Sequence, residues 1–124
     1  MGKKKLGVIG AGKMGSALVK GVLQSGWADP GSILASDVDA GICKGLAEAT
    51  SVRVSADNSE VAAFADVIVL AVKPNMVGPV LDGMRGEIDP GKVIVSIAAG
   101  VRLDTVTKHL PPKTRVVQIG RAHV

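Results

Sequence analysis

Aromatic side chains and cysteines are nearly absent from this sequence. Trp27 and Phe64 are the aromatic residues, 2% of the chain, and there is no tyrosine. A surface for single-stranded nucleic acid stacks bases on aromatic side chains within a basic groove, and no such pattern occurs here. Cys43 is the single cysteine, which excludes an intrachain disulfide and favours a reducing compartment, the cytoplasm. We expect Cys43 to pack as a small apolar residue on a helix.

Long apolar segments and targeting signals are missing as well. The longest apolar run, Val67 to Val72, is far shorter than the ~20 residues that cross a bilayer. The start MGKKKLGVIGAGK is basic but lacks the sustained apolar region of a secretory signal, and Leu6 stands where a myristoylation signal has Ser or Thr. Much of the net charge of +4 comes from Lys3, Lys4 and Lys5, a solvated run. We therefore expect neither a membrane nor a nucleic-acid partner.

Glycine and aliphatic residues dominate instead. The 124 residues are 47% apolar and 21% charged and include 16 glycines, a composition typical of one globular domain. The core is expected to consist of Val, Ile, Leu and Ala, with many tight turns between its elements.

The chain is organised around the stretch LGVIGAGKMG, residues 6–15. Its apolar start predicts a short buried strand, and helical periodicity follows it. Between strand and helix, Gly10, Gly12 and Gly15 have the spacing G-x-G-x-x-G. The first glycine permits a tight turn, the second a close approach to a pyrophosphate, and the third close helix–strand packing. Because a helix N-terminus also attracts phosphate, this context predicts a dinucleotide site rather than a glycine-rich turn without a ligand.

A second signal follows the predicted strand Ile33 to Ser36. Asp37 lies 22 residues beyond Gly15, where such folds place the residue that contacts the adenosine ribose. A carboxylate accepts from a free 2′-hydroxyl and repels a 2′-phosphate, whereas the hydroxyl of Ser36 can donate to a phosphate. No Arg or Lys follows before Lys44, so a basic clamp for NADP is not evident. The sequence leaves open which residue faces the ligand, and Asp37 as the cap of the next helix is an alternative.

The segment Asp57-Asn58-Ser59-Glu60 has the pattern of a capping box. Asp57 is the expected cap, with Glu60 reaching back to it. Asn58 could equally be a ligand contact at the carboxyl edge of the sheet, although the local pattern by itself favours capping. The helices on either side are expected to bury Ile42, Leu46 and Ala49, and Val61, Phe64 and Ala65.

The remaining elements alternate between strands and helices. Further strands are predicted at Val52–Val54, Val67–Val72, Val93–Ile97 and Arg115–Val117. Lys73-Pro74 begins a helix that buries Val77, Val80, Leu81 and Met84, and a later helix carries Leu103, Val106 and Leu110. This alternation predicts an α/β fold, a Rossmann-type doubly wound parallel sheet of about six strands with helices on both faces. Four strand ends then meet at one crevice: the glycine loop, Ser36-Asp37, Ala71 to Pro74 and Ile97 to Ala99.

Three segments together resemble the N-terminal cofactor domain of pyrroline-5-carboxylate reductase. They are IGAGKMG at the first turn, ADVIVLAVKP at residues 65–74 and VSIAAGV at residues 95–101, and the resemblance extends over residues 6–117. It implies an oxidoreductase that reduces 1-pyrroline-5-carboxylate to L-proline by hydride transfer from NAD(P)H. The second and third segments argue against a deazaflavin-dependent NADP reductase or a hydroxyacid dehydrogenase. A cofactor-binding module without turnover remains an alternative.

The resemblance also assigns roles along the crevice. The backbone of residues 9–14 would hold the pyrophosphate, Ser36 and Asn58 would lie on the adenosine side, and residues 71–74 and 97–99 would line the nicotinamide half. The family usually prefers NADPH, so NADP(H) is expected, with NAD(H) as the alternative that Asp37 leaves open. The predicted cofactor-binding residues are Ile9, Gly10, Ala11, Gly12, Lys13, Met14, Gly15, Ser36, Asp37, Asn58, Ala71, Val72, Lys73, Pro74, Ile97, Ala98 and Ala99.

No residue of this chain is predicted to be catalytic, and no metal site is expected. The imine substrate is activated by its own protonation, so no acid in this chain need be catalytic. Lys73 is the tempting candidate, as a lone cation on the nicotinamide side, but its position before Pro74 makes a structural role at least as good an interpretation. His109 is interpreted as a residue at the carboxyl end of a helix.

The end of the sequence departs from the family pattern. The family continues past a strand like residues 115–117 with Arg-Met-Pro-Asn and then a helical domain that forms the dimer and most of the substrate site. Here the chain ends in IGRAHV, which reads like the translation of a sequencing adapter. We therefore expect an NAD(P)-binding domain at 1–117, a non-native tail at 118–124, and no dimerisation and substrate domain. The fragment alone is then expected to be inactive, and its full-length parent a homo-oligomer.

Overall fold

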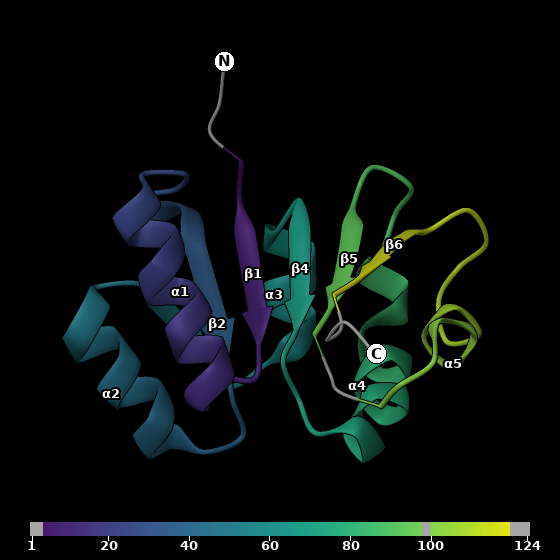
Figure 1. Cartoon of the computed structure of the whole chain (residues 1–124), viewed down its shortest axis with the longest axis horizontal. Coiled ribbons are helices and arrows are strands. Elements are labelled where there is room, and N and C mark those ends of the chain that lie inside the picture. The colour runs from purple at the N-terminus through teal and green to yellow at the C-terminus, as the bar shows by residue number, and fades with distance from the viewer. Residues whose placement is uncertain (1–3, 98–99, 120–124) are drawn as a thin grey trace, which may run out of the picture.

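Six parallel strands form one sheet in the order β3-β2-β1-β4-β5-β6 (Figure 1). The computed structural model describes residues 4–97 and 100–119. The chain runs outward from β1 to β3, returns to β4 beside β1, and continues outward to β6, so the switch point lies between β1 and β4. This confirms the predicted doubly wound parallel sheet. The strands are β1 Leu6–Ile9, β2 Ile33–Ser36, β3 Arg53–Ser55, β4 Val67–Leu70, β5 Val93–Ser96 and β6 Arg115–Gln118.

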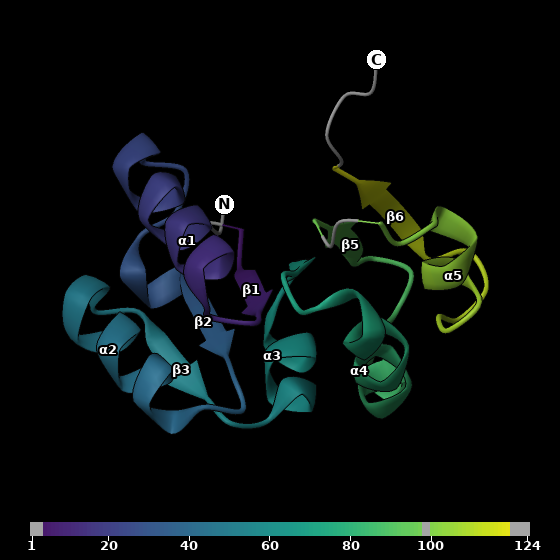
Figure 2. The same cartoon turned by 60° about the horizontal axis from the view of Figure 1, so that its bottom comes forward.

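The helices of the described chain lie on both faces of this sheet (Figures 1 and 2). They are α1 Lys13–Ser25, α2 Ala40–Thr50, α3 Asn58–Phe64, α4 Val77–Met84 and α5 Leu103–Thr107. Short 3-10 turns occupy Pro30–Ser32, Pro74–Met76 and Arg85–Glu87. None of the helices in the described part of the chain has the length and apolar character needed to cross a bilayer.

Two apolar cores, one on each face, explain the continuous hydrophobic runs in the central strands. Val8 of β1 and Val69 of β4 pack under α1 and α2. Their neighbours in sequence, Ile9 and Ile68, pack against α3, α4 and α5 on the other face. Because successive side chains of a strand point to opposite faces, both sets are buried and no polar alternation appears.

The strands differ from their predicted bounds by one or two residues. β4 ends at Leu70, and Ala71 turns away after its N–H donates to the carbonyl of Ile9 at 2.8 Å. β3 begins one residue later than predicted, and β5 ends at Ser96. At the other end, β6 includes Gln118, which pairs with Ser96 and belongs to the segment expected to be a tail.

Helix α2 presents a different face to the core from the one predicted. Asp39 caps it, accepting the N–H groups of Gly41 at 2.8 Å and Ile42 at 3.2 Å. A helix that begins there turns Cys43 and Leu46 inward and leaves Ile42 and Ala49 exposed, so their assignment to the core was wrong. Leu103 of α5 is also exposed, whereas the four predicted core residues of α4 are all buried.

Candidate functional site

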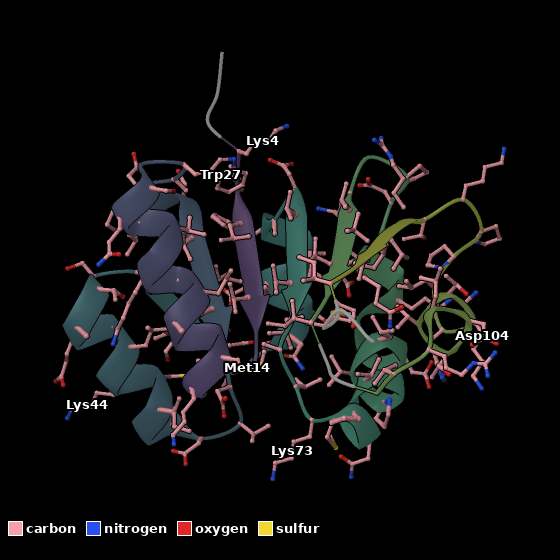
Figure 3. The ribbon with its side chains drawn as sticks, viewed as in Figure 1. Lys4, Met14, Trp27, Lys44, Lys73 and Asp104 are labelled. Atoms are coloured by element: carbon pink, nitrogen blue, oxygen red, sulfur yellow. The ribbon has the colours of Figure 1, made fainter. Side chains whose placement is uncertain are left out.

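A crevice of about 440 Å³ opens at the carboxyl ends of the central strands. It lies at the switch point of the sheet, where doubly wound folds bind ligands. Figure 3 shows Met14 and Lys73 at this edge and Trp27 and Lys4 at the opposite one. The predicted residues that line the crevice are Ile9, Gly10, Gly12, Asp37, Asn58 and residues 71–73.

The three motif glycines have three different local environments. Gly10 has φ +98°, and a Cβ there would lie 2.7 Å from the carbonyl oxygen of Ala71. A Cβ on Gly15 would lie 1.8 Å from the carbonyl oxygen of Gly10, so α1 can pack on the strand only without a side chain at this position. Gly12 is different, since a Cβ there would meet nothing within 4 Å. The loop therefore needs Gly10 and Gly15 to fold, and Gly12 leaves open backbone at the crevice.

The N-terminus of α1 is left without a side-chain cap. Gly12 occupies the cap position, no side chain accepts from the first amides, and the first turn carries no acidic residue. The first amides of a helix have no partner within it. This end of α1 thus retains both hydrogen-bond donors and partial positive charge for an anion.

Asp37 joins the glycine loop to the end of β2. Its Oδ2 accepts the N–H of Ala11 at 2.9 Å, and its Oδ1 accepts the N–H of Asp39 at 2.9 Å. The cap of α2 is Asp39, so the alternative role of Asp37 as that cap is wrong. The structure instead places the Asp37 carboxylate on the crevice wall.

Ser36 stands behind this wall and does not face the crevice. Its side chain is completely buried, and its Oγ donates to Oδ1 of Asn58 at 2.7 Å. Asn58 lines the crevice and is also the first residue of α3. A place in the capping segment of α3 and a place at the ligand-binding edge of the sheet are therefore compatible. The cap is Asp57, which accepts the N–H of Ser59 at 2.9 Å, but Glu60 accepts from Ser55 at 2.6 Å and does not complete the predicted capping box.

The β4 side of the crevice is formed by residues 71–73. Lys73 has the extended backbone that a following proline requires, with φ −62° and ψ 149°, and Pro74 begins the 3-10 turn. Lys73 is the single cation among the described residues that line the crevice. This backbone conformation is compatible with the structural interpretation of Lys73.

The other predicted residues lie outside the lining of the crevice. Ala11 and Gly15 are buried behind the loop, Lys13 and Met14 are exposed on the first turn of α1, and Ile97 is half-buried beyond β5. Pro74 is exposed at the 3-10 turn. Ala98 and Ala99 fall outside the described residues.

Sequence reasoning missed an apolar wall made by Val38, Ile42, Met76 and Val80. Val38 follows Asp37 and is 97% exposed, an unusual position for an aliphatic side chain that nothing covers. The available signal was an apolar residue in a loop directly after the predicted ribose-binding position.

Cys43 lies beneath the loop that carries Asp37. Its Sγ is 3.7 Å from the carbonyl oxygen of Asp37 and 3.8 Å from that of Ser55. Burial raises the pKa of the Cys43 thiol, against the lowering effect of the hydrogen bond to the Asp37 carbonyl. The expected packing role of Cys43 is confirmed by its burial, and the described residues contain no cluster of three metal ligands.

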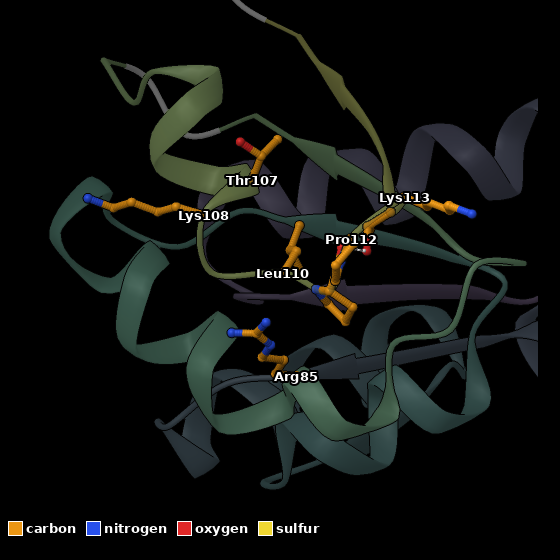
Figure 4. A pocket seen from close by; sticks show the side chains of 8 residues that line it. Arg85, Thr107, Lys108, Leu110, Pro112 and Lys113 are labelled. Atoms are coloured by element: carbon orange, nitrogen blue, oxygen red, sulfur yellow. Dashed lines mark hydrogen bonds between the residues drawn. The ribbon is translucent and has the colours of Figure 1, made fainter.

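A second hollow, of about 460 Å³, lies between the end of α4, the end of α5 and the turn before β6 (Figure 4). Arg85, Lys108 and Lys113 line it, but the lysine side chains extend to opposite sides in Figure 4. It contains no predicted cofactor residue. The crevice at the switch point is therefore the candidate site.

Comparison with known proteins identifies the family. Residues 5–100 match the family described as NADP oxidoreductase, coenzyme F420-dependent. The chain belongs to this family. Its description corresponds to the deazaflavin-dependent alternative, whereas individual relatives are pyrroline-5-carboxylate reductases, and the resemblance to their NAD(P)-binding domain is confirmed.

The pyrroline-5-carboxylate reductase of Methanosarcina acetivorans is 44% identical over 119 residues, 96% of this chain and 44% of that protein. Among solved structures, the Coxiella burnetii enzyme has a TM-score of 0.88 at 28% identity, covering 94% of this chain and 43% of that one. The Plasmodium falciparum pyrroline carboxylate reductase with NADP bound has a TM-score of 0.81 at 26% identity, covering 95% and 42%. The chain thus spans less than half the length of these family members.

Proposed function

We propose that this chain is the cofactor-binding part of a pyrroline-5-carboxylate reductase, with residues 1–117 as an NAD(P)-binding domain. The observation that carries the proposal is the glycine loop, in which two glycines are required for folding and the third leaves open backbone at an uncapped helix N-terminus. A pyrophosphate fits this arrangement because it needs amide donors and close backbone approach.

The rest of the crevice fits the two ends of a dinucleotide. Val38 and Ile42 offer apolar surface to an adenine, with Asp37 and Asn58 as polar partners for its ribose. Ala71, Val72 and Lys73 would line the nicotinamide half, and residues 97–99 remain predicted contacts there.

The bound NAD(P)H would supply a hydride to the C=N bond of 1-pyrroline-5-carboxylate. The chain's own residues would bind and orient the dinucleotide, and none is proposed to exchange a proton with the substrate. NADP(H) is the expected cofactor from the family, with NAD(H) as the alternative. We further propose that the substrate site and the homo-oligomer contacts of the parent enzyme lie outside these residues, so that the 124 residues alone show no turnover.

Calorimetric titration with NADH and with NADPH tests the binding proposal. The 124-residue chain should bind at least one of them. Gly12→Leu should abolish binding without unfolding, because a Cβ at position 12 meets nothing within 4 Å and the added side chain would cover the open backbone there. Gly21→Leu, at an equally open site farther along α1, is the matched control and should bind as the parent does. A folded chain that binds neither dinucleotide would contradict the proposal.

A further inference from the structure

Asp37 is the charged residue at the β2 end of the crevice, and its carboxylate is held from two sides. Oδ2 accepts the N–H of Ala11 in the glycine loop, and Oδ1 accepts the N–H of Asp39, both at 2.9 Å. These two backbone donors fix the orientation of the carboxylate. Each oxygen still has capacity for a further donor, so this carboxylate is prepared to accept a hydroxyl group.

Among the described residues that line the crevice, none at the β2 end carries a positive charge. Lys73, the single lysine or arginine among the described lining residues, belongs to the β4 end. Lys44, the next basic residue after Asp37, projects outward from α2 in Figure 3. Asp39 and Asp57, which cap α2 and α3, add negative charge to the neighbouring loops.

We propose that Asp37 makes this crevice select the dinucleotide with a free ribose 2′-hydroxyl, NADH over NADPH. This inference rests on the proposed function above. The 2′-hydroxyl of NADH can donate to the carboxylate, whereas the 2′-phosphate of NADPH brings negative charge and acceptor oxygens to a group that has no proton to give. A like charge without a compensating cation disfavours binding.

A preference for NADH would distinguish this chain from the description of its family. That description names NADP, and the P. falciparum relative is a complex with NADP. Here the position after Asp37 is Val38, whose exposed side chain offers apolar contact and no hydrogen-bond donor. The sequence at the end of β2 thus supplies one acceptor and one apolar surface, which suits an adenosine without a 2′-phosphate.

Titration of the parent chain with both cofactors at one ionic strength is the first test. NADH should bind about tenfold or more tightly than NADPH. Equal or tighter binding of NADPH would overturn the inference while leaving the proposed function standing. Binding of neither by a folded chain would overturn the proposed function and this inference with it.

Three variants then assign the preference to Asp37. Asp37→Asn removes the charge and should lower the NADH-to-NADPH preference by about tenfold. Asp39→Asn removes the same charge two residues away and preserves a good cap for α2. The NADH-to-NADPH preference of this variant should therefore stay within about threefold of that of the parent chain. An equal shift in both variants would show a general field effect and would overturn the role of Asp37.

Val38→Arg, the third variant, keeps the test decisive if Asp37→Asn does not fold. Val38 is 97% exposed, so replacing it removes no core packing. The guanidinium introduced by this substitution would reach the region beside Asp37 and pair with a 2′-phosphate. The preference should then shift toward NADPH by about tenfold, and an unchanged ratio would contradict the placement of the ribose at this end.

Discussion

The two halves of the sheet form their ends of the crevice differently. On the β1–β2–β3 side, the loops are joined by hydrogen bonds from Gly10 to Ser36, from Ala11 to Asp37 and from Ser36 to Asn58. On the β4–β5–β6 side, the wall of the crevice is mostly backbone and apolar side chains. Specific polar contacts thus shape the half proposed to hold the adenosine, whereas the nicotinamide half is shaped by packing.

The two halves of the sheet also differ in how completely their apolar side chains are buried. Helices α1 and α2 bury the β1–β2–β3 half of their face, with Val8 and Ala35 completely covered. On β6 and just beyond it, Val117 is 49% exposed and Ile119 is 57% exposed. The strands β1 and β2 of the first half are thus buried along their whole length, whereas the outer strand of the second half has apolar surface in contact with solvent.

The largest expected effect comes from Gly15, where helix α1 packs on the glycine loop. Gly15→Ala should destabilise the fold by about 3 kcal/mol or more, because its Cβ would lie 1.8 Å from the carbonyl oxygen of Gly10. Urea unfolding followed by circular dichroism measures the loss. Gly12→Ala, in open space, is the control and should change stability by less than about 1 kcal/mol. Similar losses in both would show that the helix packs less closely on the loop than the structure indicates.

Two buried serines give the sharpest comparison between the halves. Ser36, at the end of β2, donates to Asn58, whereas the hydroxyl of Ser96, at the end of β5, has no partner among the described residues. Ser36→Ala should cost about 1–2 kcal/mol, because it leaves the Asn58 acceptor unpaired. Ser96→Ala should be neutral or stabilising by up to about 1 kcal/mol. Equal destabilisation in the two variants would remove the proposed difference between the halves.

The smallest effect is a pH dependence from Cys43. Burial raises the pKa of its thiol above the ordinary value of 9.0, so the unfolded chain loses this proton first as the pH rises. The folded state then binds more protons, and stability should fall as the pH increases from the ordinary thiol pKa toward the raised one. Urea unfolding at pH 7 and pH 10 should show a larger loss for the parent than for Cys43→Ala. An identical loss in both chains would contradict the assignment to this thiol.

Local patterns predicted the fold and the glycine loop because each residue there has a steric reason to be what it is. Gly10 needs a positive φ, Gly15 has no room for a Cβ, and the β-branched run of β4 is buried on both faces. The parallel arrangement of about six strands, with helices on both faces, followed from the alternation of strands and helices and the handedness of their connections.

The details of the β2–α2 loop depended on which aspartate begins the helix. Asp39 provides the cap, which moved Ile42 from the expected core to the crevice wall and left Asp37 free to contact Ala11. Sequence alone offers two equivalent carboxylates two residues apart and cannot choose between them. The burial of Ser36 could have been predicted from the sequence, because Ser36 shares a face of β2 with Leu34. Leu34 packs toward α3.

The unequal surroundings of the three motif glycines have a consequence for the way selection acts on this loop. If variants are selected only for accumulation of folded protein, positions 10 and 15 should reject every side chain, whereas position 12 should accept many. Selection for the proposed dinucleotide binding should make position 12 restrictive as well. The history of substitution at Gly12 would then record how long a lineage has kept a bound dinucleotide, while Gly10 and Gly15 would record only that the protein folds.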